Sequence, residues 1–185
     1  MLLERKDINP DSADTETGRT PLSCAAGNGH EGAAKMLLER KGVSPDQADT
    51  EYGRTPLWWA AEKGCGGVVK MLLEREEVNP DQADTFYGWT PLAVAVRNGH
   101  EGVVKMVLER KDIRTATRDK RGQTPLSLAL SQGHNGVVKI ILEWENTNSS
   151  TVSPNGRTPL QPPTEKRKGC AVEMQSGGFK RRRLQ

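Results

Sequence analysis

Three histidines and three cysteines are the side chains of this chain best suited to bind a metal or to act as acid, base or nucleophile. Each histidine follows a glycine, at His30, His100 and His134, and Cys65 occupies the corresponding position after Gly64. If these residues occupy the same position in neighbouring packed helices of a repeated unit, their side chains lie roughly 8 to 10 Å apart. Ligands of a shared metal must each lie about 2 Å from the ion. The sequence therefore predicts no catalytic residue, no metal site and no cofactor.

Cys24 and a set of glutamates also have structural interpretations. Cys24 stands in a column of aligned positions whose other members are Trp59, Val94 and Leu128. Because that column is apolar, we expect a small buried residue and not a nucleophile. A solvated helix face is predicted for four glutamates that recur at one position: Glu39, Glu74, Glu109 and Glu143. The sequence has no glycine-rich phosphate loop and no paired nucleophile and base, so we expect a protein that is not an enzyme.

The aromatic residues are concentrated in the middle of the chain. Six of the eight lie between residues 52 and 89: Tyr52, Trp58, Trp59, Phe86, Tyr87 and Trp89. Clustered exposed aromatic side chains are typical of protein interfaces. The predicted partner-binding site consists of Tyr52, Arg54, Trp58, Phe86, Tyr87 and Trp89. Trp59 is excluded because its column is apolar, and the alternative is that the other rings fold back as extra packing.

These residues must be positioned by a repeating scaffold. The tripeptide TPL recurs at Thr20, Thr55, Thr90, Thr124 and Thr158, with steps of 35, 35, 34 and 34 residues. Such self-similarity is typical of a stacked array of short units.

Each unit predicts two short helices. Threonine is a preferred N-cap and proline suits the first helical position, as at Thr55 and Pro56. A glycine such as Gly64 favours the end of that helix, and a second helix of VVKMLL type follows. The stretch before the next TPL is rich in Pro, Asp, Asn and Gly, so we expect a projecting loop. Helices this short are marginal alone, so the units must stack.

The motif GxTPLxxAAxxGHxxVVKxLLE resembles the ankyrin repeat and covers residues 14 to about 146 in four copies. The resemblance implies an all-α solenoid of paired antiparallel helices with projecting finger loops, and histidines that bond adjacent backbone. It also implies protein binding through the concave surface of loops and first helices. The common histidine after TPL is replaced here by Ser23, Trp58, Ala93 and Ser127, so its local hydrogen bond should be absent or altered.

The predicted organisation follows the repeat period. Residues 1–13 are expected to be a partial repeat with only its second helix, and residues 14–151 four repeats (14–48, 49–83, 84–117, 118–151). Residues 152–160 open a fifth repeat that Pro162 and Pro163 prevent from continuing as a helix. Residues 161–185 are expected to be a disordered basic tail.

Charge separates the tail from the rest of the chain. Residues 1–160 hold 20 Lys and Arg against 22 Asp and Glu, whereas residues 161–185 hold 7 against 2. The seven basic residues form two clusters separated by 11 residues: Lys166, Arg167 and Lys168, then Lys180, Arg181, Arg182 and Arg183. This arrangement resembles a bipartite nuclear localisation signal, and the alternative is a solubilising or weakly nucleic-acid-binding tail.

Composition limits the class of protein and its partners. No run approaches the roughly 18 apolar residues that a membrane span needs, and three cysteines at unrelated spacings favour a reducing compartment. We therefore expect an intracellular protein, cytoplasmic or nuclear, without a membrane partner. The predicted function is non-catalytic binding of another protein, with a nuclear import receptor as a further partner. The alternative is a nuclear adaptor whose tail contacts nucleic-acid phosphates weakly, and steep salt dependence would identify it.

Overall fold

The computed structural model describes residues 9–148, which lie within one compact unit. It has eight helices in this range: α1 (Pro21–Gly27), α2 (Glu31–Leu38), α3 (Pro56–Lys63), α4 (Gly66–Leu73), α5 (Pro91–Arg97), α6 (Glu101–Leu108), α7 (Pro125–Gln132) and α8 (Asn135–Asn148). No strand occurs among residues 9–148, so the predicted all-α class is confirmed there. No helix of this part is long and apolar enough to cross a membrane.

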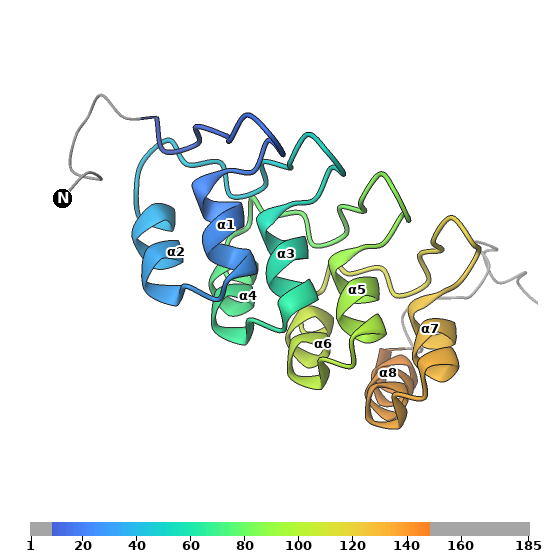
Figure 1. The fold of residues 1–185 in the computed structure, drawn as a ribbon. Helices are drawn as coiled ribbons and strands as arrows, with labels where there is room; N and C mark the ends of the chain where they lie inside the picture. The colour runs from blue at the N-terminus through green and yellow to red at the C-terminus, as the bar shows by residue number, and fades with distance from the viewer. Residues whose placement is uncertain (1–8, 149–185) are drawn as a thin grey trace, which may run out of the picture. The chain divides into compact units, whose positions relative to one another are not determined.

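Consecutive helix pairs stack into layers. The first helices α1, α3, α5 and α7 lie side by side in one row, and the second helices α2, α4, α6 and α8 form a row behind them (Figure 1). Long loops project from one end of the pairs and precede each first helix (Figure 1). The main helix contacts join helices of the same layer or of neighbouring layers, so the predicted solenoid is confirmed.

Threonine and proline start every first helix, as predicted. The Thr55 hydroxyl oxygen accepts the backbone N–H of Trp58 at 3.2 Å, and Pro56 follows at the first helical position. Thr20, Thr90 and Thr124 make the equivalent bond. Such a cap contributes about 1 kcal/mol, and it sets the residue at which each helix begins.

The serines that replace the family's histidine after TPL keep a local hydrogen bond. The Ser23 and Thr20 hydroxyl oxygens lie 3.1 Å apart. The Ser127 hydroxyl oxygen accepts the Thr124 backbone N–H at 2.8 Å and completes a reciprocal cap. The local bond is therefore altered at these two positions and not lost.

Side-chain donors that follow α4 and α6, and one within α8, bond the preceding layer. These bonds join Arg75 to the Leu38 carbonyl at 2.7 Å, Arg110 to the Leu73 carbonyl at 2.8 Å and Trp144 to the Leu108 carbonyl at 2.8 Å. Carbonyls at a helix C-terminus lack intrahelical partners, so these donors satisfy groups that would otherwise remain unpaired. The repeat pattern in the sequence did not reveal this role. The adjacent glutamates Glu39, Glu74, Glu109 and Glu143 are exposed, as predicted.

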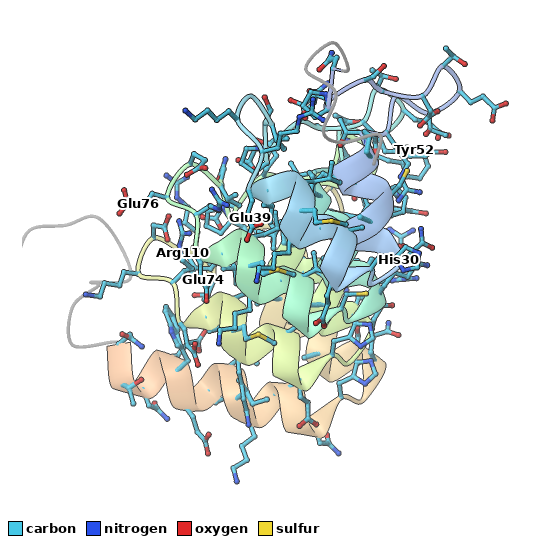
Figure 2. The ribbon with its side chains drawn as sticks, turned by 90° about the vertical axis from the view of Figure 1, so that its left-hand side faces the viewer. His30, Glu39, Tyr52, Glu74, Glu76 and Arg110 are labelled. Carbon is cyan, nitrogen blue, oxygen red and sulfur yellow. The ribbon has the colours of Figure 1, made fainter. Side chains whose placement is uncertain are left out.

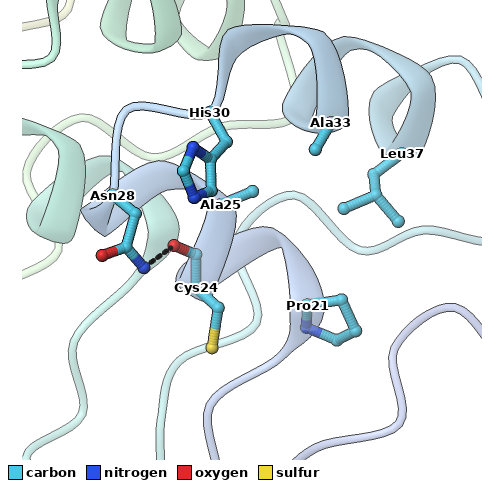
Figure 3. Close-up of a pocket in the computed structure, with 7 residues that line it drawn as sticks. All are labelled: Pro21, Cys24, Ala25, Asn28, His30, Ala33 and Leu37. Atoms are coloured by element: carbon cyan, nitrogen blue, oxygen red, sulfur yellow. Dashed lines mark hydrogen bonds between the residues drawn. The ribbon is translucent and has the colours of Figure 1, made fainter.

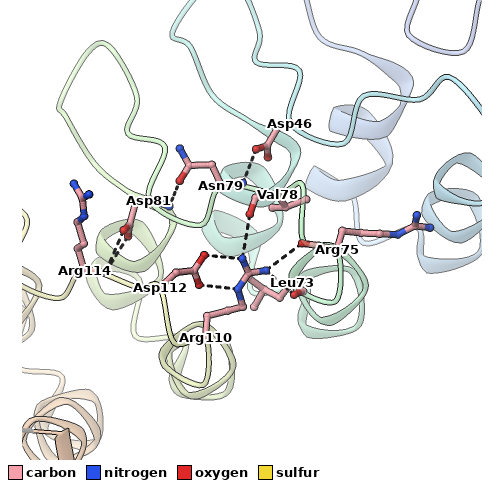
Figure 4. A network of polar contacts seen from close by, with 9 residues as sticks. All are labelled: Asp46, Leu73, Arg75, Val78, Asn79, Asp81, Arg110, Asp112 and Arg114. Atoms are coloured by element: carbon pink, nitrogen blue, oxygen red, sulfur yellow. Dashed lines mark hydrogen bonds and ion pairs between the residues drawn. The ribbon is translucent and has the colours of Figure 1, made fainter. Parts of the chain in front are cut away.

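Arg110 is the most connected of these donors. Its guanidinium also donates to the carbonyls of Arg75 at 3.1 Å and Val78 at 3.4 Å (Figure 4). It forms a two-pronged ion pair with Asp112, with a shortest N–O distance of 2.8 Å. The hydrogen bonds from Arg110 lower the pKa of the Asp112 carboxyl. The Arg110 guanidinium therefore links the third layer to the C-terminus of α4 and to the loop that follows α4.

We expect Arg110→Ala to lower the free energy of unfolding by about 2 kcal/mol, because hydrogen bonds from a charged donor contribute about 1.5 to 3 kcal/mol. Chemical denaturation measures this difference. Lys105→Ala on α6, the helix that precedes Arg110, removes an exposed cation and should change stability by at most about 0.5 kcal/mol. Equal effects of the two substitutions would refute the bridging role.

Candidate functional site

One aspartate organises each projecting loop. We call residues 14–19, 49–54, 84–89 and 119–123 the finger loops. The Asp14 carboxylate accepts the backbone N–H groups of Thr17 at 2.6 Å and Arg19 at 2.8 Å. The hydrogen bonds from Thr17, followed by that of Arg19, lower the pKa of Asp14 to about 2. Asp49, Asp84 and Asp119 accept equivalent backbone bonds, so all four loops share one local design.

The finger loops are also bonded to one another in series. Backbone N–H groups donate from Thr50 to Thr17 at 3.1 Å, from Thr85 to Tyr52 at 2.7 Å and from Lys120 to Tyr87 at 2.9 Å. Neighbouring loops approach so closely that a Cβ on Gly53 would lie 2.8 Å from the Thr85 methyl carbon. Gly53 also has a φ of 66°, which glycine adopts without strain. The loops therefore form one continuous edge and are not independent.

A chain of aromatic rings lies on this edge. The ring centroids of Tyr52 and Phe86 are 5.9 Å apart, and those of Phe86 and Tyr87 are 4.5 Å apart, both edge to face. Tyr87 then stacks on Trp89 at 4.2 Å. These four members of the predicted site are in contact, as expected for one cluster. Phe86 is 57% exposed, whereas Tyr52 and Tyr87 are partly buried.

Two tryptophans predicted as exposed anchors are buried. Trp58 is 1% exposed, and its indole Nε1 donates to the Trp89 carbonyl at 3.0 Å. Trp89 is 7% exposed, and its Nε1 donates to Asp119 Oδ2 at 3.1 Å. The prediction that both belong to an exposed surface is wrong, because each indole reaches the next layer and fills the space between layers. Both rings are packing residues.

The structure also contradicts two predictions of burial, which rested on the apolar column of Cys24, Trp59, Val94 and Leu128. Trp59, expected in the core, is only partly buried, and its Nε1 donates to Asp49 Oδ2 at 3.0 Å. Cys24, in the same column, is exposed, so the prediction of burial is wrong there too. The column is buried at Val94 and Leu128, where a preceding layer covers it. No described layer precedes α1, and an indole is larger than the side chains of that slot.

Arginines stack on these rings from the finger side. The Arg54 guanidinium carbon lies 4.4 Å from the ring centroid of Tyr52 and 4.1 Å from that of Trp58. Arg19, which sequence reasoning missed, lies 4.0 Å from the Trp59 centroid and donates to the Ser23 carbonyl at 3.1 Å. Cation–π contacts of this kind contribute about 0.5 to 2 kcal/mol. Arg54 therefore supports Tyr52 from within the array.

The histidines bond backbone between layers. His100 Nε2 lies 3.0 Å from the Glu62 carbonyl oxygen, and His134 Nε2 lies 3.0 Å from that of Arg97. Both contacts join one layer to the preceding one, as the family resemblance implied. Burial raises the pKa of the Cys65 thiol in the same position. Within residues 9–148, no three His, Cys, Asp or Glu side chains converge as a metal site would require.

The aromatic finger edge and the glutamate column occupy different parts of the array. Figure 2 shows Tyr52 among the finger loops, well apart from Glu39 and Glu74. The second predicted site, the basic clusters Lys166 to Lys168 and Lys180 to Arg183, lies outside the described residues. The localisation signal therefore stays a prediction, as do the residue ranges of the individual repeats.

Comparison with known proteins agrees with the repeat pattern. A family model described as ankyrin repeats (3 copies) matches residues 1–84, 47–117 and 76–151. A search of curated proteins found no significant match.

The buried position of Trp58 predicts a large loss of stability on truncation. We expect Trp58→Ala to cost about 3 to 5 kcal/mol, because it removes a buried aromatic and leaves a cavity. Phe86→Ala should cost about 1 kcal/mol or less, because it removes only partial ring contacts. Denaturant titration of both variants tests this order, and a larger loss for Phe86→Ala would contradict the assignment.

The Asp14 bonds predict a pH dependence. A carboxyl whose folded-state pKa is lowered adds stability above its unfolded pKa, and that stability is lost as pH falls from the ordinary 3.8 towards about 2. NMR titration should give Asp14 a midpoint of about 2. Thr17→Val removes the hydroxyl bond to Asp14 and should raise the midpoint. A wild-type midpoint near the ordinary value would contradict the finger geometry.

Proposed function

This chain belongs to the ankyrin-repeat family, whose model matches within residues 1–151, and from this premise we propose that its finger edge binds another protein. Ankyrin repeats generally are protein–protein interaction modules. The proposed binding surface consists of Tyr52, Phe86 and Tyr87, with Arg54 as its support. Trp58 and Trp89 hold that surface in place and do not belong to it.

Phe86 is the observation that carries this proposal. A phenylalanine that is 57% exposed at a loop tip leaves apolar surface in water. Its backbone N–H donates to Asp84 at 2.9 Å, so the loop that presents it is held in shape. An aromatic side chain already fixed by its neighbours loses little conformational freedom on binding, which favours affinity.

Charges on either side of Phe86 indicate the chemistry of the partner. Glu51 is exposed on the preceding finger, and its carboxylate raises the pKa of the Tyr52 hydroxyl. Arg121 is exposed on the following finger beside Lys120, whose ammonium donates to the Thr85 carbonyl. An acidic, an aromatic and a basic finger therefore follow one another. The partner should bury an apolar side chain at Phe86 and place basic groups near Glu51 and acidic groups near Arg121.

Truncation of Phe86 tests the proposal. We expect Phe86→Ala to weaken partner binding by about 2 kcal/mol or more, roughly thirtyfold in Kd, as for an interface hot spot. Affinity capture with the full chain, compared by mass spectrometry, should identify the proteins lost with this variant. Titration calorimetry with such a protein then measures Kd.

Met36→Ala is the matched control, because Met36 is also a large exposed apolar residue but lies on α2, away from the fingers. It should retain the partners of the finger edge. Loss of the same proteins from both variants, or from neither, would refute the finger edge as the binding surface.

A further inference from the structure

The face of the array formed by α1 and α2 has no described layer against it. It contains an open hollow lined by Pro21, Cys24, Ala25, Asn28, His30, Ala33 and Leu37 (Figure 3). We call this the leading face. The equivalent positions Pro56, Ala60 and Val68 in the second layer are buried, because the first layer covers them. The inner layers therefore show what kind of surface fits the leading face.

Two polar side chains of the leading face match residues that bond a preceding layer elsewhere. In the third layer, Asn98 Nδ2 and His100 Nε2 contact the Glu62 carbonyl oxygen at 3.1 and 3.0 Å. Asn28 and His30 are the same residue types in the same positions of the first layer. Asn28 Nδ2 donates to the Cys24 carbonyl of its own helix at 2.8 Å, and the His30 imidazole makes no hydrogen bond within the described residues. The first layer thus keeps donors suited to a preceding carbonyl.

A glycine position leads to the same conclusion. A Cβ on Gly67 would lie 2.0 Å from Glu31 Oε1, and one on Gly136 would lie 1.9 Å from Glu101 Oε1. A glutamate side chain of the preceding layer lies over each of these glycines. Gly32 and Gly102 occupy the same position in the first and third layers, and nothing lies within 4 Å of a Cβ built at either. At Gly102 the preceding layer has Gly66 in place of a glutamate, whereas at Gly32 no preceding layer is described. The space above Gly32 is open to a side chain from another layer.

The opposite face, formed by α7 and the first turns of α8, has the complementary features. We call it the trailing face. Leu130 is 61% exposed, whereas Ala26, Ala61 and Val96 at the same position of the first three layers are buried. Ser131 corresponds to Glu62, whose carbonyl accepts the bonds from Asn98 and His100. The trailing face therefore carries an uncovered apolar side chain next to the position of the interlayer acceptor.

We propose that the leading face binds the trailing face of a second copy of this chain, head to tail, so that the stack continues across two molecules. In this arrangement Leu130 covers the hollow, His30 donates to the Ser131 carbonyl, and Asn135 lies over Gly32. The contact repeats the interface that already joins the layers, and it uses α7 and only the first part of α8. Because the two faces differ, the contact leaves one of each free and forms an open series of oligomers.

Charge insertion at Leu130 tests the contact. Sedimentation velocity over a concentration series should show wild-type dimers and higher oligomers, and Leu130→Glu should weaken association tenfold or more, as expected for loss of a buried leucine. Phe86→Glu is the matched control, because Phe86 is similarly exposed but lies on the fingers. It should associate normally while losing the partner of the finger edge, and Leu130→Glu should keep that partner. The two proposals can therefore fail separately.

An intermolecular disulfide tests how the two copies are aligned in the proposed contact. A Cβ on Gly27 would lie 3.6 Å from the Trp59 Cβ in the neighbouring layer, within the range of about 3.5 to 4.5 Å for a disulfide. Ser131 and Cys24 are the equivalent pair across two stacked copies. Ser131→Cys should form intermolecular disulfides on mild oxidation, and a further Cys24→Ser substitution should abolish them. Retained cross-linking without Cys24, Cys24–Cys24 or 131–131 linkage as the main product, or a monomer at high concentration would each overturn the proposal.

Discussion

Bonds between successive layers are the constraint on which this structure depends. Each helix pair is too short to be stable alone, and every layer leaves backbone groups that only its neighbour can satisfy. Finger amides such as that of Thr85, histidines such as His100 and arginines such as Arg110 each reach a carbonyl of the preceding layer. Trp58 reaches in the other direction, to the carbonyl of Trp89. Polar pairing and apolar burial thus act at the same interfaces.

The same constraint explains what the sequence could predict. Periodicity identified the stack, and Thr55 with Pro56 located a helix start, because caps depend on local residue chemistry. Arg110 escaped notice because charged residues at a helix end are usually solvated. Its carbonyl acceptors lie 32 to 37 residues away and become neighbours only when the layers stack.

The site was harder to predict than the fold. A column of aligned residues gives the average environment of a position, and a much larger side chain changes that environment. The serine and alanine residues aligned with Trp58 gave no sign of burial, yet Ser23 and Ala93 are buried as Trp58 is, and the Trp58 Nε1 finds an acceptor in the next layer. Trp59 shares its column with the buried Val94 and Leu128 yet remains partly exposed, beside Asp49 and Arg19. Among the aromatic members of the predicted site, Tyr52, Phe86 and Tyr87 keep exposed surface.

The packing residues and the proposed binding surface therefore belong to one set of contacting aromatic rings, in which the buried indoles support the exposed rings. Residue-resolved hydrogen exchange of the four tryptophan indole N–H groups tests this account most directly. The account predicts the slowest exchange for Trp58, followed by Trp89, and faster exchange for the partly exposed Trp59 and Trp144. Exchange of the Trp58 indole as fast as that of Trp59 would contradict it.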